Sequence, residues 1–264
     1  FFCRSNTQRP VAKVGMTDGI RQVLQEESDA LRAYYEQAGI LIARPAGGTS
    51  CRLAISAKGG TNAENHNHND VGSYAVALGS ETMVGDQGGP NSYPGDYFNG
   101  DAPQKYKIKG SFGHPVPVVD GRTQSSGGKA KGVVLQKEFT NEKDVFSIDY
   151  TSAYSTPNLD KLIRTFVYDR QGKGSFTVGD EFTAKTPIRF ETAITTRADW
   201  KILDDTHLLL ATDSEQMIVA IEASGKVAFT SETIEVNSPA YTRIGIALKN
   251  QSKEGYIRLK MYTK

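Results

Sequence analysis

Short runs of β-forming residues recur along most of this chain, and clusters of Gly, Asn, Asp and Pro separate them. Turns every 8 to 12 residues or so are typical of an antiparallel sandwich. The predicted strands span 40–43, 51–57, 73–78, 82–84, 116–119, 132–139, 145–150, 162–168, 175–183, 188–195, 200–203, 207–211, 217–222, 241–248 and 256–262. We therefore predict an all-β fold, a large antiparallel β-sandwich of two stacked sheets.

The segment 17–36 departs from this rhythm. Asp18 is suited to cap a helix, and apolar residues at 20, 24 and 31 approximate a one-sided stripe among strong helix formers. We expect an N-terminal helical and linker segment over 1–38, followed by the sandwich over 39–264. The first ten residues contain no initiator Met and no signal-peptide pattern, so we expect the chain to be part of a longer protein.

Charge and composition exclude several classes of protein. The chain has 31 Lys and Arg against 30 Asp and Glu, a net charge of +1, which predicts no nucleic-acid partner and no membrane surface. No stretch approaches the roughly 18 consecutive apolar residues of a membrane span. Cys3 and Cys51 lack CxxC partners, which excludes a cysteine metal site; one disulfide and two free thiols both remain open.

Residues 85–115 form a long loop between predicted strands, and they are rich in Gly and Pro. Loops of this length in compact domains are usually functional or disordered. Aromatic residues of this loop, among them Tyr93, Tyr97, Phe98 and Tyr106, argue against disorder. The small polar segment 120–132, by contrast, is predicted to be a mobile hairpin tip.

Two of the four histidines stand at alternate positions in the motif Asn-His-Asn-His-Asn-Asp, residues 65–70. On an extended segment His66, His68 and Asp70 would share one face. Two imidazoles and a carboxylate suit zinc. Taken alone, the motif fits solvated or hydrogen-bonded loop histidines better than a metal site, but Asp86 and His114, each in a Gly-containing turn, strengthen the interpretation as a metal site.

A straight strand cannot bring these ligands together. If residues 73–84 form a hairpin that turns at Gly79 and Ser80, Asp86 lies across from residue 73. Five extended residues would then place His68 roughly 17 Å away. The chain must therefore turn back near residues 70–72, and Asp70 can cap that turn instead of binding metal.

The order and spacing of these motifs resemble the C-terminal β-sandwich of the heparinase II/III-like polysaccharide lyases, a group that includes oligoalginate lyases. The motifs are HNHNDVGSYAVALGSETMVGDQG, SFGHPVPVVDG and LIRTFVYDR, with YYEQAGILIARP resembling the segment that leads into the sandwich. The resemblance extends from about residue 34 to 195. It implies a domain of an enzyme that cleaves uronic-acid-containing polysaccharides by β-elimination.

The resemblance also implies roles for individual residues. His68, Asp86 and His114 match the ligands of a zinc ion that is structural in that family. His66 matches the histidine that neutralises the uronate carboxylate. Pro115 departs from the pattern, because Asn commonly follows the later histidine, and this bears on the local loop geometry.

The chemistry explains why such a histidine is needed. The C5 proton of a uronate is weakly acidic until its carboxylate is neutralised by hydrogen bonds or positive charge. We therefore expect His66 to act in catalysis, and Asn65, Asn67 and Arg44 to bind substrate, although Arg44 can instead pair with a buried carboxylate. Two tyrosines of the long loop are candidates to line the cleft or act as an acid, with packing of the loop as the alternative: Tyr93 and Tyr97.

In that family an N-terminal α/α toroid supplies most of the base and acid, and this chain lacks it. The expected partners are therefore that toroid, within the same protein, and an anionic uronate-containing polysaccharide or oligosaccharide. We expect the fragment alone to be inactive and the protein to be periplasmic or secreted. Two alternatives are a non-catalytic carbohydrate-binding or scaffold module, and a metal-dependent hydrolase that uses His66, His68 and Asp70.

Overall fold

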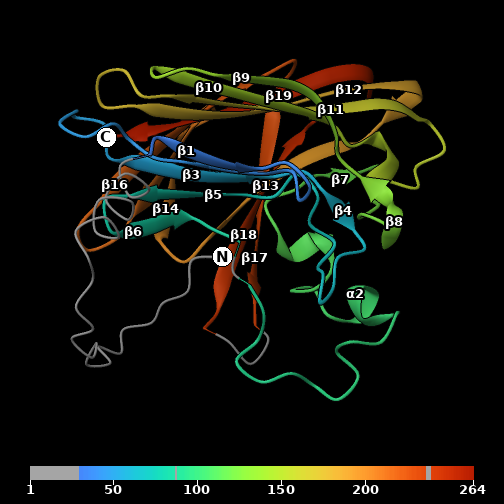
Figure 1. Cartoon of the computed structure of the whole chain (residues 1–264). Coiled ribbons are helices and arrows are strands. Elements are labelled where there is room, and N and C mark those ends of the chain that lie inside the picture. The colour runs from blue at the N-terminus through green and yellow to red at the C-terminus, as the bar shows by residue number, and fades with distance from the viewer. Residues whose placement is uncertain (1–29, 87, 236–238) are drawn as a thin grey trace, which may run out of the picture.

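The computed structural model describes residues 30–86, 88–235 and 239–264, which form two layers of antiparallel strands (Figure 1). One layer is an eight-stranded sheet, whose strands β9, β10, β11, β12 and β19 lie above β1, β3 and β5 in the view of Figure 1. The other layer consists of a five-stranded and a four-stranded sheet. The predicted all-β antiparallel sandwich is confirmed.

The eight-stranded sheet provides the longest strands. From one edge to the other they are β14 (Asp199–Asp204), β15 (His207–Ala211), β16 (Gln216–Ala223), β19 (Ser252–Thr263), β12 (Ser175–Ile188), β11 (Leu159–Asp169), β10 (Lys143–Asp149) and β9 (Val133–Phe139). Buried and exposed residues alternate along β11 and along much of β12, as expected for a sheet with one face on a core.

The opposite layer is assembled from two sheets. The five-stranded sheet contains β1 (Arg32–Tyr35), β2 (Ile40–Ala43), β3 (Leu53–Lys58), β5 (Tyr74–Leu78) and β6 (Glu81–Val84). The four-stranded sheet contains β17 (Val227–Ile234), β18 (Tyr241–Leu248), β13 (Phe190–Thr196) and β7 (Val118–Val119). The two sheets meet where the Gly85 amide donates to the Thr195 carbonyl at 3.0 Å and the Thr196 hydroxyl donates to the Met83 carbonyl at 2.6 Å.

Short elements complete the described chain. β4 (Thr61–Asn62) pairs with β8 (Gly127–Lys131), and the remaining elements are the helix α2 (Ala102–Lys105) and the 3-10 turns η1 (Ser111–Gly113) and η2 (Thr151–Ala153). In this part of the chain no helix is long and apolar enough to cross a bilayer.

An aromatic stack fills the space between the layers. Phe166 is nearly parallel to Phe146 and to Phe176, with ring centroids 5.9 and 6.1 Å away, and Tyr74 approaches from the opposite layer. All four rings are at most 1% exposed. Aromatic rings bury large areas and prefer offset or tilted contacts, so this stack contributes strongly to the packing of the two layers.

One ion pair lies inside this core. Arg164 on β11 and Asp180 on β12 are cross-strand partners, and their side chains are 0% and 1% exposed. The guanidinium donates to both carboxylate oxygens, at 2.7 and 2.6 Å. Its other N–H groups reach Thr192 and two loop carbonyls, those of Gly72 at 2.7 Å and Pro115 at 2.8 Å. The buried charge is therefore fully hydrogen-bonded and connects the eight-stranded sheet to two loops.

The expected helix over 17–36 is wrong for its last residues. Arg32–Tyr35 forms the edge strand β1, which pairs with β2; the earlier residues of that prediction lie outside the described part of the chain. Tyr34 packs against Phe139 and Phe146 with ring centroids 5.7 Å away in both cases, so tertiary contacts outweigh the helical pattern. The turn into β2 requires Gly39, whose φ is +61° and whose Cβ would lie 2.7 Å from the Gly60 nitrogen.

The polar segment 120–132 is also more structured than predicted. Its second half forms β8, and Gln124 is only 4% exposed. The strand β17 was missed as well, because its sequence, VAFTSETI, contains too few apolar residues at alternate positions to give a strand pattern. Of the two cysteines, Cys51 is buried beside the Tyr168 hydroxyl, while Cys3 lies outside the described residues.

Replacing Arg164 with Met should lower the free energy of unfolding by about 3–5 kcal/mol, because Asp180 would remain buried without its partner. Urea denaturation of the purified chain measures this change. Arg258 provides a matched control: its side chain is 40% exposed and pairs with Glu181 and Glu222 on the surface, so Arg258→Met should cost at most about 1 kcal/mol. Equal effects of the two substitutions would contradict the central role of Arg164.

Candidate metal centre and adjoining aromatic loop

His114 is the most deeply buried of the predicted ligands, at 1% exposure. It follows η1, and its ring is held between two acceptors. Nε2 lies 3.1 Å from the Ile108 carbonyl, and Nδ1 lies 3.0 Å from Oδ2 of Asp86. A ring whose Nε2–H donates to a carbonyl directs Nδ1 at the carboxylate, an arrangement that commonly orients a metal-binding histidine.

Asp86 follows β6 and lies opposite the start of β5. The Ser73 hydroxyl donates to its Oδ2 at 2.9 Å, and the Gly88 amide donates to its Oδ1 at 3.2 Å. The predicted position of Asp86 across the hairpin from residue 73 is confirmed. The hairpin turn at Gly79 and Ser80 is confirmed as well.

Asp70 lies in the turn that was predicted to reverse the chain. Its carbonyl accepts from the Ser73 amide at 2.9 Å, and its carboxylate pairs with the Lys58 ammonium group. The ligand atoms of Asp70, Asp86 and His114 all lie within 4.8 Å of one another. The side chain of Asp70 therefore faces the candidate metal centre in addition to its place in the turn.

His68 lies beside this group without joining it. Its ring centroid is 5.2 Å from that of His114, and its Nε2 is 3.1 Å from the Tyr97 hydroxyl. Burial, followed by the charge of His114, lowers the pKa of His68 from 6.5 to about 3. The ring is therefore neutral at pH 7, which is the form that binds metals.

The carboxylate and imidazole of the Asp86–His114 pair stabilise each other's charged forms. Burial opposes ionisation of Asp86, but the charge of His114 and its hydrogen bond outweigh burial, and the pKa of Asp86 lies below its ordinary value. Burial likewise opposes protonation of His114, but Asp86 raises the pKa of that ring. A cation at this place would meet an ionised carboxylate.

His66 is exposed and contacts the long loop. Its φ is +58°, in the left-handed region, and its exposed ring packs on Phe98 with centroids 4.7 Å apart. The prediction that this motif is a loop and not a straight strand is confirmed, because a turn from Glu64 to Asn67 interrupts the extended segment on which His66, His68 and Asp70 would share one face. His66 is left accessible, while His68 is directed inward.

The predicted substrate-binding residues lie in different places. Asn65 is exposed next to His66, and Asn67 donates to the His68 carbonyl and accepts from Lys58 at 3.4 Å. Arg44 is not brought to the site. Ile40, at the start of β2, pairs with Lys58 next to the metal centre, whereas Arg44 follows the other end of β2. Its guanidinium donates to the Ala30 carbonyl at 3.4 Å.

The two predicted tyrosines also differ. Tyr97 is 1% exposed, and burial raises its pKa to about 12, so its hydroxyl stays protonated beside His68. Tyr93 is 56% exposed, and its ring lies 5.1 Å from those of Tyr97 and Phe98. Packing therefore accounts for Tyr97, and Tyr93 faces solvent.

Gln124 organises the histidine loop and was missed. Its side-chain oxygen accepts from Asn62 at 3.0 Å and from the Val71 amide at 3.1 Å, and its side-chain nitrogen donates to the Val71 carbonyl at 2.7 Å. Its own carbonyl accepts from Asn69 at 3.3 Å. A glutamine in a polar, Gly-rich segment shows no local pattern that predicts burial. The only indication in the sequence is the Asn-rich motif, whose residues could supply hydrogen-bond partners for it.

The donor set is suitable for zinc. Imidazole nitrogen and carboxylate oxygen are zinc ligands, and His114 has the outer hydrogen bond that such ligands usually make. Asp86 and His114 are in contact, and both His68 and Asp70 lie near them. The imidazole and carboxylate groups gathered here therefore fit a zinc ion, with the ligand atoms of Asp70, Asp86 and His114 within 4.8 Å of one another and His68 beside them.

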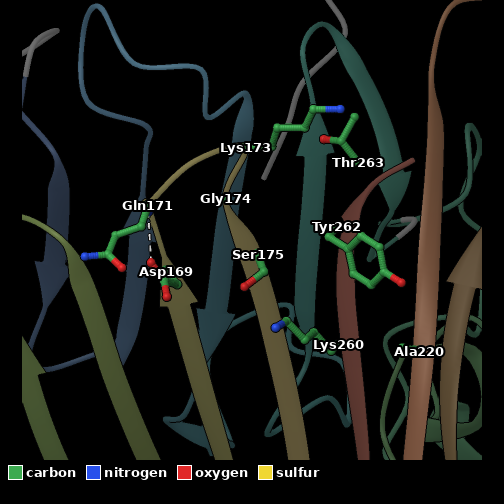
Figure 2. A pocket seen from close by; sticks show the side chains of 9 residues that line it. All are labelled: Asp169, Gln171, Lys173, Gly174, Ser175, Ala220, Lys260, Tyr262 and Thr263. Atoms are coloured by element: carbon green, nitrogen blue, oxygen red, sulfur yellow. Dashed lines mark hydrogen bonds between the residues drawn. The ribbon is translucent and has the colours of Figure 1, made fainter.

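A second concavity lies elsewhere on the molecule. Figure 2 shows a pocket beside the turn between β11 and β12, with side chains that include Asp169, Lys173 and Lys260. This turn lies against Cys51, near the start of β3, because a Cβ at Gly174 would meet that side chain. The metal centre adjoins Lys58, at the opposite end of the same strand, so the pocket and the metal centre are separated by the length of β3. The lining contains no histidine, so we assign it no part in the site.

Known proteins resemble this chain in structure. No family model matches the chain, and no curated protein matches it by sequence. A crystal structure of heparinase III aligns with a TM-score of 0.69 at 18% identity, covering 88% of this chain and 36% of that chain. Heparan sulfate lyase HepC from Pedobacter heparinus gives 0.69 at 15% identity, covering 89% and 37%. A further heparinase III structure gives 0.67 at 12%, covering 89% and 36%.

These alignments establish the fold. The chain has the same fold as part of heparinase III and of HepC, in agreement with the resemblance seen in its motifs. It spans little more than a third of the length of those chains, 36% and 37%.

In metal-free protein, the free energy of unfolding should fall by about 1–2 kcal/mol from about pH 7 to 5 through His68 alone. The unfolded ring takes up a proton near pH 6.5, whereas the folded ring does so only near pH 3, so acid favours the unfolded chain. Urea titrations in chelator at both pH values, on wild type and His68→Gln, isolate this difference. The same pH dependence in both proteins would show that His68 is not held neutral.

Proposed function

We propose that this chain is the β-sandwich part of a polysaccharide lyase that cleaves uronic-acid-containing polysaccharide by β-elimination. The proposal includes a structural zinc ion, an N-terminal α/α toroid in the same protein, and a periplasmic or secreted location. The isolated chain should be inactive, because the toroid would supply the principal base.

One observation carries this proposal: a chain with the heparinase III fold brings its histidine loop, Asp86 and His114 together on one side of the sandwich. These residues are separated in sequence, and the turn at Asp70 together with the long loop gives them a common location. Fold alone does not define function, so the argument depends on this grouping.

Zinc would be held by His68, Asp86 and His114, with Asp70 next to them. When bound, the ion would supply a fixed positive charge and cross-links between the histidine loop and the long loop. The protein residues hold the ligands in place: Ile108 accepts from His114, Ser73 donates to Asp86, and Lys58 neutralises Asp70. The function of the site would be to keep His66 in position.

His66 is suited to meet the substrate. Its ring is exposed, whereas His68, two residues later in the same loop, is directed inward to the Tyr97 hydroxyl. The His66 ring can therefore donate a hydrogen bond to the ionised carboxylate of a substrate. Neutralising the uronate carboxylate stabilises the negative charge that develops when the C5 proton leaves. Asn65 and Asn67, on either side, provide amide donors of the same kind.

The hydrolase alternative has less support. It requires His66, His68 and Asp70 to hold one ion, but His66 contacts Phe98 while Asp70 pairs with Lys58.

Elemental analysis of the purified chain tests the metal. We expect about one zinc ion per chain in the wild type, and loss of both zinc and thermal stability in Asp86→Ala and His114→Ala, because structural zinc contributes to folding. His207→Ala is the control, since His207 pairs with Asp204 on the surface. Wild-type protein without metal, or variants that keep it, would contradict the zinc site.

Activity is tested on the longer protein that contains this chain. With heparan sulfate, alginate or other uronates we expect an unsaturated product that absorbs in the ultraviolet. His66→Ala should lower kcat about 100- to 1000-fold, because it removes one stabilising donor. No elimination of any uronate polymer by the wild type would overturn the lyase and favour a binding module.

A further inference from the structure

We propose that Tyr93 and Phe98 form a platform on which a second sugar ring of the substrate stacks, next to the uronate that His66 contacts. This inference rests on the proposed function and extends it from a single carboxylate contact to a binding subsite. The platform consists of these two exposed rings of the long loop.

The two rings are unusually open for aromatic side chains. Tyr93 is 56% and Phe98 is 50% exposed, and their centroids are 5.1 Å apart. Exposed aromatic residues that gather on one surface commonly mark an interaction site. Tyr97 contacts both rings and its hydroxyl lies 3.1 Å from Nε2 of His68, so the pair lies next to the candidate metal centre.

A buried ring supports the platform from below. Tyr97 lies 5.1 Å from Tyr93 and 5.4 Å from Phe98, and its hydroxyl contacts His68. Lys109 fastens this segment: its ammonium donates to the Tyr97 carbonyl at 2.5 Å and lies 5.0 Å from the Phe98 centroid. The exposed rings are therefore held in place before a ligand arrives, which lowers the entropy cost of binding.

His66 joins the platform directly. Its ring lies 4.7 Å from that of Phe98, and its φ of +58° is a conformation that residues other than Gly rarely adopt. Strained backbone of this kind is common at ligand-binding positions. The hydrogen-bonding ring of His66 and the apolar faces of Phe98 and Tyr93 thus form one continuous surface.

This combination matches the chemistry of an acidic glycan. A pyranose ring presents C–H groups on its face, which pack on aromatic rings, and hydroxyl and carboxylate groups at its edge. The buried ammonium group of Lys109 lies against the Phe98 ring, and the ring of His66 next to Phe98 can donate a hydrogen bond to a carboxylate; both favour a negatively charged chain over a neutral one. We therefore assign an anionic oligosaccharide to the platform, in preference to a neighbouring protein domain.

The test uses the longer, active protein and its steady-state kinetics. Tyr93→Ala and Phe98→Ala should each raise KM about tenfold and leave kcat within about twofold, because stacking away from the reacting bond contributes equally to substrate and transition state. Tyr93→Phe should retain the wild-type KM, since the ring and not the hydroxyl makes the contact. Tyr35→Ala is the matched control, because Tyr35 is also 56% exposed but lies on β1.

Three results would overturn the platform. An unchanged KM in both alanine variants would show that the rings do not contact substrate. A fall in melting temperature of the longer protein without a change in KM would show that a neighbouring domain covers them. Equal loss in Tyr93→Phe and Tyr93→Ala would assign the effect to the hydroxyl.

A failure of the lyase proposal is distinguishable. If the wild-type protein eliminates no uronate polymer, calorimetry with heparan-sulfate oligosaccharides still tests the platform. Binding that weakens about tenfold in Phe98→Ala but not in Tyr35→Ala would support the platform, and binding that is absent, or equal in both variants, would overturn it.

Discussion

The guanidinium of Arg164 is the contact on which both the sandwich and the candidate site depend. Within the core it pairs with Asp180, and it also donates to the carbonyls of Gly72 and Pro115. Gly72 ends the turn that begins at Asp70, and Pro115 follows His114. A single buried cation therefore fixes the backbone beside two of the grouped residues. Its removal would leave a carbonyl in each loop without this donor and the Asp180 carboxylate without its counter-charge, with only the Tyr150 and Thr192 hydroxyls donating to it.

The outer face of the four-stranded sheet provides the second support. Tyr241, on β18, donates to the Gly113 carbonyl at 2.8 Å, and it packs with Tyr97, Ile108 and Ile234 in a small separate core. This core lies under the long loop and holds its residues 88–115 in place, although they contain little secondary structure. The loop carries His114 and the platform, so packing far from the main core decides the position of the chemical groups.

Prediction was most successful where local pattern decides structure. Most strands follow from alternating β-forming residues and turn signals, and the meeting of Asp86 with Ser73 follows from hairpin geometry. The failures have tertiary causes. Arg32–Tyr35 is a strand because β2 and Phe139 provide partners, and Gln124 is buried because the histidine loop supplies its hydrogen bonds.

By itself the sequence determined the antiparallel β architecture and the candidates for metal and substrate binding, because hydrophobic alternation, turn residues and ligand spacing are local properties of a chain. Only the tertiary structure decided what each candidate contacts. It directed His66 outward onto Phe98 and His68 inward, buried Tyr97, joined Asp70 to Lys58 and left Arg44 at the far end of β2. These outcomes depend on contacts between residues distant in sequence, for which no local pattern exists.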